Sequence, residues 1–316
     1  MKKLFIISGG VGSEREVSLA SGKNVFETLK NEGVICEEII IEKDRSFLVR
    51  DKNMSEQDGL LLLKHENALV FQLIHGTYGE DGEFVKKLEE AGVAYIGSHS
   101  DVLLLTIDKY ATEKLLQEND VHTPESLFIT PDISITDIDI SNFPVIVKPN
   151  KEGSSIGVKK VTSIQELRAT LEEYLHSYSE VIVQKCLSGR EFTCGVLEMD
   201  GQCVALAVSE VIISADRLFD YDSKYNSKEV IEITPAEIDS ELRTKIQSLA
   251  LQVHAVCGCK DISRTDMMLD ENGELVVLEI NTIPGMTKVS FVPAEMAASS
   301  YSLSDFVKGM VEKYSK

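Results

Sequence analysis

Several features are missing from this chain of 316 residues, and their absence narrows what it can be. Tryptophan does not occur, proline occurs only 7 times, and we find neither an internal repeat nor a low-complexity segment. No apolar run reaches the roughly 20 residues that cross a bilayer. Lys2 and Lys3 lead into an apolar run too short for the core of a signal peptide. The sequence therefore predicts a cytoplasmic protein without a membrane partner.

Basic residues are in the minority, because 32 Lys and Arg stand against 52 Asp and Glu, giving a net charge of −20. This charge argues against nucleic acid or an anionic membrane as a partner, although it leaves room for a local basic pocket that binds phosphates. Cysteine is also sparse, with 6 residues scattered outside any paired C-x-x-C cluster. Cys257-Gly258-Cys259 is a weak metal or redox signal, and we favour buried free thiols.

Length and composition indicate a globular protein of two or three domains. The chain exceeds one ordinary hydrophobic core, and 43% of its residues are apolar and 27% charged. Within residues 1–97, runs typical of buried strands alternate with helical patterns, which predicts a parallel α/β domain. Ser13 and Glu16 form a capping box that should begin the first helix. The expected strands are 4–7, 38–41, 68–74 and 93–96, and the expected helices are 13–30 and 83–91.

The rest of the chain predicts two further units, residues 98–180 and residues 181–316. Residues 214–234 are polar and charged with little periodicity, which indicates a long functional loop. The expected strands are 126–130, 144–148, 157–161, 181–185, 192–199 and 202–213, the last two as an antiparallel pair. The expected helices are 108–119, 164–176, 237–256 and 305–314.

Two apolar-rich segments, 264–269 and 275–281, flank a turn that contains Asn272-Gly273. Asn-Gly between such runs is a strong signal for a hairpin with a two-residue type I′ loop. That register places Asp266 opposite Glu279 and Arg264 opposite Asn281, all on one face. The other face would carry core residues, namely Thr265, Met267, Leu269, Val276, Leu278 and Ile280.

Two carboxylates that face each other on a ladder repel, so we expect a cation between Asp266 and Glu279. Removal of either carboxylate should then stabilise the metal-free protein. Asp, Glu and Asn oxygens are hard ligands that suit Mg²⁺, which leaves its other positions to phosphates and water. Two solvated carboxylates on an exposed face are the alternative that the hairpin alone leaves open.

A Gly/Ser-rich loop, residues 151–157, follows an apolar strand that ends near Lys148. Backbone N–H groups and hydroxyls in such a loop can bind anionic oxygens, although an ordinary hairpin loop would also explain the glycines. The position of Lys148 indicates a partly buried charge that needs an anion. Lys109, at an expected helix start, is either a second phosphate-binding cation or a solvated surface lysine.

A set of segments, each weak alone, is highly specific in combination. They are Gly9-Gly10 with Glu14-Arg15-Glu16-Val17-Ser18; His75-Gly76-x-Tyr78-Gly79-Glu80-Asp81-Gly82; Asp108-Lys109; Val147-Lys148-Pro149 with Glu152-Gly153-Ser154-Ser155-x-Gly157; Gly189-x-Glu191-Phe192-Thr193; Tyr221-Asp222-x-Lys224-Tyr225; and Arg264-x-Asp266 with Leu278-Glu279-x-Asn281-Thr282-x-Pro284-Gly285-Met286-Thr287. In this order, the chain resembles the D-alanine–D-alanine ligase family of ATP-grasp enzymes from residue 4 to about residue 293.

The resemblance implies an α/β and α+β multidomain fold. A parallel α/β domain, 1–97, would precede a two-part ATP-grasp fold of a central subdomain, 98–180, and a C-terminal subdomain, 181–316. ATP would lie between the last two, and residues 214–234 would form a mobile loop that closes the site. The resemblance further implies ATP with two Mg²⁺ ions (or Mn²⁺), D-alanine as the small-molecule substrate of a peptidoglycan-precursor ligase, and a homodimer.

The resemblance also assigns site residues. The implied metal ligands are Asp266, Glu279 and Asn281. The implied nucleotide contacts are Lys109, Lys148, Lys224 and Ser155 for the phosphates, Gln184, Lys185 and Leu187 along the adenine stretch, and Glu191 for the ribose. Among the implied catalytic residues, Arg264 and the N–H of Gly285 stabilise an oxyanion, Glu14 binds the first D-alanine, and Ser290 binds the second. Ser154, Tyr225 and Glu14 would form a hydrogen-bonded trio that closes the site.

The sequence departs from the family pattern at Gln184-Lys185-Cys186, where glutamate commonly begins the adenine-contacting stretch. Such departures leave the choice of substrates open. One alternative is an ATP-grasp ligase that joins other amino acids, and another is a non-catalytic nucleotide-binding relative. The intact metal-ligand and lysine positions argue against the second alternative.

Overall fold

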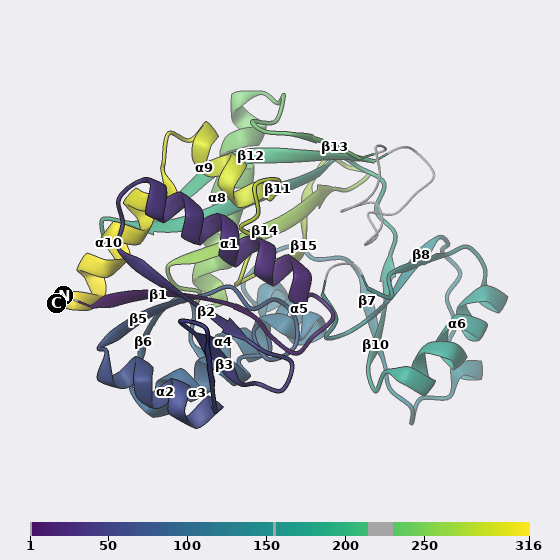
Figure 1. Cartoon of the computed structure of the whole chain (residues 1–316). Helices are drawn as coiled ribbons and strands as arrows, with labels where there is room; N and C mark the ends of the chain where they lie inside the picture. Colours follow the sequence, from purple (N-terminus) through teal and green to yellow (C-terminus); the bar gives the residue numbers. More distant parts are fainter. Residues whose placement is uncertain (1, 154–155, 214–229) are drawn as a thin grey trace.

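The computed structural model describes residues 2–153, 156–213 and 230–316. These residues form three sheets, of six, four and five strands, in sequence order. In Figure 1 the first and third sheets lie in one body, and the four-stranded sheet with α6 (Ile164–Ser177) extends to one side. The chain ends lie together in that body, where the Lys2 N–H donates to Ser315 Oγ at 3.1 Å. Among the described helices, none has the length and apolar character needed to cross a membrane.

The first sheet has the strand order β4-β3-β2-β1-β5-β6. Its parallel strands are β1 (Lys3–Gly9), β2 (Cys36–Ile41), β5 (Ala68–Gln72) and β6 (Ala94–Ile96). This arrangement confirms the predicted parallel α/β layer. The strands β3 (Phe47–Val49) and β4 (Lys52–Met54) extend one edge of the sheet in antiparallel fashion. Each has only three residues, which is too short for its sequence pattern to predict a strand.

Helices pack on both faces of this sheet because the side chains of β1 alternate and are buried on each side. Phe5 and Ile7 lie in an apolar cluster with residues of α2 (Glu56–His65) and α3 (Glu83–Ala91). Leu4 and Ile6 lie in a second cluster with residues of α1 (Arg15–Asn31). The predicted capping box of α1 is wrong: the helix is preceded by Glu14 as its N-cap residue, and the Glu14 side chain makes no capping hydrogen bond.

The four-stranded sheet is antiparallel, with the order β7-β10-β8-β9. Its strands are β7 (Ser126–Ile129), β8 (Val145–Pro149), β9 (Lys159–Val161) and β10 (Val181–Lys185), and α6 packs on them. The sequence placed residues 181–185 at the start of the third unit, whereas β10 is hydrogen-bonded between β7 and β8. The pairing partners of a strand are distant in sequence, which is why its own pattern did not reveal them. The division into domains itself stays a prediction.

The third sheet has the order β13-β12-β11-β14-β15 and is also antiparallel. The strands are β11 (Glu191–Met199), β12 (Gln202–Ile213), β13 (Val230–Ile233), β14 (Ile262–Leu269) and β15 (Leu275–Asn281). The predicted pair 192–199 and 202–213 is therefore confirmed. The remaining α-helices among the described residues are α4 (Ser100–Ile107), α5 (Lys109–Glu118), α8 (Ser240–Val256), α9 (Phe291–Ala298) and α10 (Leu303–Ser315).

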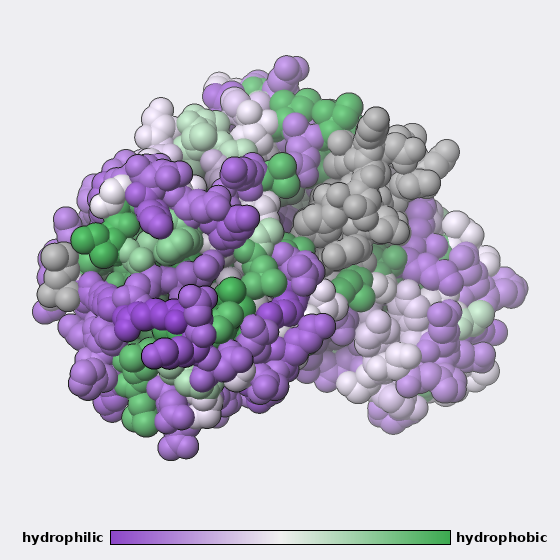
Figure 2. Space-filling model, in the orientation of Figure 1, coloured by the Kyte–Doolittle hydropathy of each residue, from purple (hydrophilic) through white to green (hydrophobic). Residues whose placement is uncertain are grey.

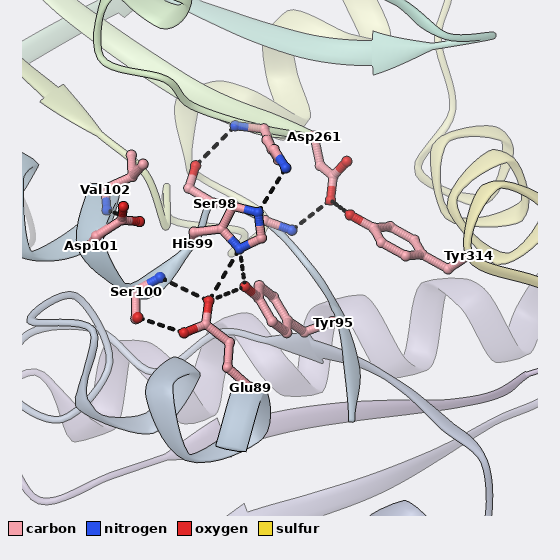
Figure 3. Close-up of polar contacts among 11 residues, drawn as sticks. Glu89, Tyr95, Ser98, His99, Ser100, Asp101, Val102, Asp261 and Tyr314 are labelled. Atoms are coloured by element: carbon pink, nitrogen blue, oxygen red, sulfur yellow. Dashed lines mark hydrogen bonds and ion pairs between the residues drawn. The ribbon is translucent and has the colours of Figure 1, made fainter. Parts of the chain in front are cut away.

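The first and third sheets are joined by apolar and polar contacts. Residues of β1 and α1 share an apolar cluster with Met286, Val292 of α9 and Phe306 of α10. The buried carboxylate of Asp261 accepts hydrogen bonds from the Gly97 N–H after β6, from Lys313 Nζ and from the Tyr314 hydroxyl, each at 2.7 Å. Figure 3 shows Asp261 and Tyr314 beside the Glu89, Tyr95 and His99 contacts. This packing fixes the ends of β6 and β14 relative to each other.

The outer surface in the view of Figure 2 is mostly hydrophilic, with small and scattered apolar areas. This pattern agrees with the 27% of charged residues in the sequence. Apolar side chains gather instead in the clusters between the sheets and helices.

Candidate active site

The hairpin of β14 and β15 positions four polar side chains as the sequence predicted. Asp266 pairs with Glu279, and Arg264 pairs with Asn281. The predicted two-residue loop is wrong, however. The Asp270 N–H donates to the Glu274 carbonyl at 2.9 Å, and Gly273 adopts φ +80, which leaves a three-residue loop with a left-handed glycine.

A bulge restores the predicted register at the site. Near the loop, Met267 pairs with Val277, one residue out of the predicted register, and the ladder shifts before Asp266. The extra residue on β15 is Leu278, which was expected on the core face. Leu278 instead lines the cleft beside Glu279, and Val277 takes its place in the core with 1% exposure.

Arg264 and Asp266 form a bidentate ion pair at the centre of this face. Arg264 Nε and Nη2 donate to the two Asp266 carboxylate oxygens at 2.7 and 2.6 Å. The Thr193 hydroxyl donates to Asp266 Oδ1 at 2.6 Å, and Asn281 Nδ2 donates to Oδ2 at 3.2 Å. Burial opposes the charge of Arg264, but the carboxylates of Asp266 and Glu279 raise its pKa above the usual value.

Two lysines lie on the other side of Glu279. The Lys109 ammonium is 4.0 Å from a Glu279 oxygen and donates to the Glu152 carbonyl at 2.5 Å. Lys148 is 8% exposed, and burial together with the positive charge of Lys109 lowers its pKa to about 8. The predicted partly buried charge on Lys148 is therefore confirmed. An anion beside Lys148 would compensate that burial.

A cleft of about 180 Å³, which we call the lysine cleft, opens above these lysines. Its walls come from β8, β10, β14 and β15, with Ile146, Met268 and Leu278 among the apolar lining residues. The predicted nucleotide contacts that line it are Lys109, Lys148, Gln184, Lys185, Leu187 and Glu191. The predicted contacts Ser155 and Lys224 lie outside the described residues.

Gln184 is held from below by a buried acid that the sequence did not single out. Its Nε2 donates to a carboxylate oxygen of Glu113 on α5 and to Ser126 Oγ, the latter at 3.0 Å. Burial raises the pKa of Glu113. Because both amide protons have partners here, the Gln184 carbonyl is the group left to face the cleft.

A second cleft, the Glu14 cleft, adjoins the same face of the hairpin. The predicted residues that line it are Glu14, Arg264, Glu279, Asn281, Gly285 and Ser290. The backbone approaches Glu14 closely, since a Cβ built on Gly76 would lie 2.7 Å from its Oε2, and Gly76 has φ +67. Ser154 and Tyr225, the other expected members of the closing trio, lie outside the described residues.

His75 and Glu80 also line the Glu14 cleft, although the sequence assigned them no role. His75 Nδ1 is 3.7 Å from Glu80 Oε1, and its Nε2 is 3.1 Å from the Ser21 hydroxyl. Both residues belong to the glycine-rich segment 75–82 that carried part of the family resemblance. Their place in that segment was the feature of the sequence that could have predicted a position in the site.

The two clefts meet at Glu279, which lines both. Asp266 lines the lysine cleft and Asn281 the Glu14 cleft, so the three expected metal ligands lie along the junction. Two carboxylates and an amide oxygen fit the hard-ligand preference of Mg²⁺. In the described part of the chain, no group of three or more His, Cys, Asp and Glu side chains could hold a metal ion, so such a site depends on Asn281.

Comparisons with known proteins agree with this geometry. Residues 125–312 match the family model "D-ala D-ala ligase C-terminus". The chain is 34% identical to a D-alanine–D-alanine ligase of Cupriavidus pinatubonensis over 311 residues, covering 98% of this chain and 90% of that protein. It is 33% identical to a D-alanine–D-alanine ligase of Fervidobacterium nodosum over 316 residues, covering 95% and 94%.

Solved structures show the same fold over almost the whole chain. The VanG D-Ala:D-Ser ligase of Enterococcus faecalis superposes with a TM-score of 0.81 at 28% identity, covering 99% of both chains. The D-alanine–D-alanine ligase of Bacillus anthracis complexed with ATP gives a TM-score of 0.78 at 28% identity, covering 99% of this chain and 97% of that one. The chain therefore belongs to the D-alanine–D-alanine ligase family.

Proposed function

We propose that this protein is an ATP-dependent ligase that joins two D-alanine molecules through an acyl phosphate, for peptidoglycan precursor synthesis. The observation that carries the proposal is the junction of two chemically different clefts at Glu279. The lysine cleft offers cations for phosphates, and the Glu14 cleft offers a carboxylate for an ammonium group. The ATP complex of the Bacillus anthracis relative and the names of the curated relatives support these ligands.

The lysine cleft would hold ATP with its γ-phosphate toward the junction. Lys109 and Lys148 would contact the phosphates, and the apolar walls at Ile146 and Met268 would enclose the base. Gln184 would accept from the base through its carbonyl. Lys185 and Leu187 would contact the same ring, and Glu191 would accept from the ribose hydroxyls. Ser155 and Lys224 stay predictions.

The Glu14 cleft would hold the two amino acids. Glu14 would bind the ammonium group of the first D-alanine, and the Ser290 hydroxyl would bind the carboxylate of the second. Arg264 and the Gly285 N–H would face the carbonyl oxygen that becomes negative during attack. The trio of Glu14, Ser154 and Tyr225 stays a prediction.

The chemistry follows from the fact that a carboxylate has no good leaving group. An amine cannot displace oxide from a carboxylate, but phosphoryl transfer from ATP to that carboxylate creates an acyl phosphate with a good leaving group. Lys109 and Lys148 would neutralise charge during the transfer. Arg264 and the Gly285 N–H would then stabilise the tetrahedral oxyanion formed when the second amine attacks. A closed site would protect the acyl phosphate from water.

Asp266, Glu279 and Asn281 would hold the magnesium, expected as two ions with Mn²⁺ as a substitute. Bound ions would supply positive charge that neutralises the phosphate oxygens. Because Arg264 already pairs with both Asp266 oxygens, the carboxylate would have to share them with the ion. The cytoplasm is the compartment we expect, since ATP is available there, and the expected homodimer remains to be measured.

The decisive experiment measures ATP-dependent phosphate release with D-alanine, L-alanine, D-serine and D-lactate, and identifies each product by mass. We expect D-alanyl-D-alanine as the main product. The likeness to VanG makes D-serine as the second substrate the specific competing outcome. If none of the four compounds triggers phosphate release, the result would contradict a ligase of this substrate class and favour a binding protein.

A further inference from the structure

Helix α1 holds both backbone polar groups of Met286, the residue after Gly285. The Met286 N–H donates to Ser21 Oγ at 3.2 Å, and Asn24 Nδ2 donates to the Met286 carbonyl at 2.7 Å. Ser21 and Asn24 lie nearly one turn apart on the helix, so they reach the same segment. More than 260 residues separate this helix from Met286 in the sequence.

The packing around these hydrogen bonds is tight. Ser21 is 0% exposed, and the Met286 side chain, 1% exposed, lies in the apolar cluster with Val25 and Leu29 of α1. On the other side, the Thr287 N–H donates to Ser290 Oγ at 3.0 Å. The segment after Gly285 is thus fixed at two consecutive residues, once by α1 and once by Ser290.

From this arrangement we propose that Ser21 and Asn24 are positioning residues for the oxyanion donor Gly285. Neither residue lines the Glu14 cleft. By fixing the peptide groups on either side of Met286, they anchor the chain directly after Gly285 and so restrict where its N–H can lie. The inference rests on the proposed function, in which that N–H stabilises the tetrahedral oxyanion.

The same helix also carries Glu14, the residue proposed to bind the first ammonium group, directly before its first turn. Ser21 lies two turns further on, about 10 Å along the axis. One rigid helix therefore sets the separation between the ammonium site and the oxyanion donor. An error of about 1 Å in such a separation can slow a reaction on the order of a hundredfold.

Ser21 also connects this clamp to the cleft through His75. Ser21 Oγ accepts from the Met286 N–H and also lies within hydrogen-bond distance of His75 Nε2, at 3.1 Å. The other ring nitrogen, Nδ1, lies 3.7 Å from Glu80 Oε1. Ser21 thereby contacts both the Met286 backbone and a histidine that lines the Glu14 cleft.

The test compares Ser21→Ala and Asn24→Asp with the matched control Ser18→Ala. Asn24→Asp keeps the side-chain size but removes the donor to Met286. Ser18 is also 0% exposed on α1 and also makes two hydrogen bonds, but it accepts from the Gly9 N–H at 2.8 Å and donates to the Leu73 carbonyl at 2.6 Å. The control therefore removes a similar clamp that does not involve Met286.

Three readouts separate positioning from stability: kcat with KM for ATP, the affinity for a phosphinate dipeptide that mimics the tetrahedral adduct, and urea unfolding. For Ser21→Ala and Asn24→Asp we expect kcat to fall at least about tenfold while KM for ATP changes less than twofold. Affinity for the phosphinate should fall by the same factor as kcat/KM for D-alanine. The Ser18→Ala protein should lose about as much stability as the Ser21→Ala and Asn24→Asp proteins, but its kcat should stay within about threefold of wild type.

Equal kcat losses in Ser18→Ala and the two clamp variants would show a structural role only and overturn the proposal. Unchanged phosphinate affinity in the clamp variants would overturn it as well. Wild-type activity distinguishes failure of the positioning role from failure of the proposed function. If wild type joins D-alanine while the clamp variants match it, only the positioning role fails; if wild type forms no dipeptide, the proposed function fails and the positioning role with it.

Discussion

Arg264 donates two hydrogen bonds, at 2.7 and 2.6 Å, to the two carboxylate oxygens of Asp266 in the face that joins the two clefts. The cation expected between Asp266 and Glu279 is therefore partly provided by the chain itself. This pair changes the expectation that loss of either facing carboxylate would stabilise the metal-free protein. Arg264 already balances the negative charge of Asp266, and Arg264 itself is only 6% exposed.

Asp266→Ala should abolish ligase activity and lower the free energy of unfolding by about 3 kcal/mol, because it leaves the buried Arg264 without its main partner. Glu279→Ala should abolish activity as well, but it should change stability by less than about 1 kcal/mol, since Glu279 is 36% exposed. Urea unfolding in EDTA and phosphate release would measure the two effects. An Asp266→Ala protein as stable as wild type would contradict the assigned role of the ion pair.

Lys148→Met should stabilise the ligand-free protein at neutral pH by roughly 3 kcal/mol and abolish nucleotide binding. Folding lowers the pKa of Lys148 from 10.5 to about 8, so the unfolded chain holds the extra proton between these values. Wild-type stability from this residue therefore rises with pH from about 8 to 10.5, and the substitution should remove that rise. Unfolding titrations across this range would measure it. Lys23→Met, at a side chain that is 73% exposed, is the control and should leave stability unchanged.

Glu295→Gln should remove a pH dependence of stability from the core behind Arg264. Burial raises the pKa of Glu295 from 4.5 to about 8, while it accepts from the Gly195 N–H at 2.7 Å and from the Ser209 hydroxyl at 2.9 Å. The stabilisation is complete below about pH 4.5 and is lost as pH rises through 8. The advantage of the variant should grow by about 1.4 kcal/mol per pH unit in that window. A difference that does not vary with pH would show that Glu295 stays ionised.

Asp261→Ala should cost about 3 kcal/mol of stability, because a buried acceptor of three hydrogen bonds is lost beside Lys313. Asp261→Asn should cost less, since an amide still accepts and Asn tolerates the φ of +61 at this position. His99→Ala is the control within the same network (Figure 3) and should cost less than about 1 kcal/mol, because the His99 side chain is 51% exposed. Thermal unfolding would rank the three variants. Equal losses for Asp261→Ala and His99→Ala would contradict the importance of the buried carboxylate.

The sequence by itself determined the chemistry and the local pairing of the site. Alternating side chains and the Asn-Gly turn predicted Asp266 opposite Glu279, and the apolar strand before Lys148 predicted a buried charge. These features depend on neighbours in sequence and on residue type. The same local rules were insufficient for the three-residue loop and for the bulge at Leu278, which cancel each other in register.

Only the tertiary structure decided which distant groups meet. The Glu113 carboxylate beneath Gln184 and the hydrogen bonds from α1 to Met286 each depend on how sheets and helices pack. The lowered pKa of Lys148 likewise needs burial and the nearby charge of Lys109, and neither can be read from a linear pattern. Sequence periodicity specifies which face of an element is apolar, whereas the partner that covers this face is selected by the free energy of the whole fold.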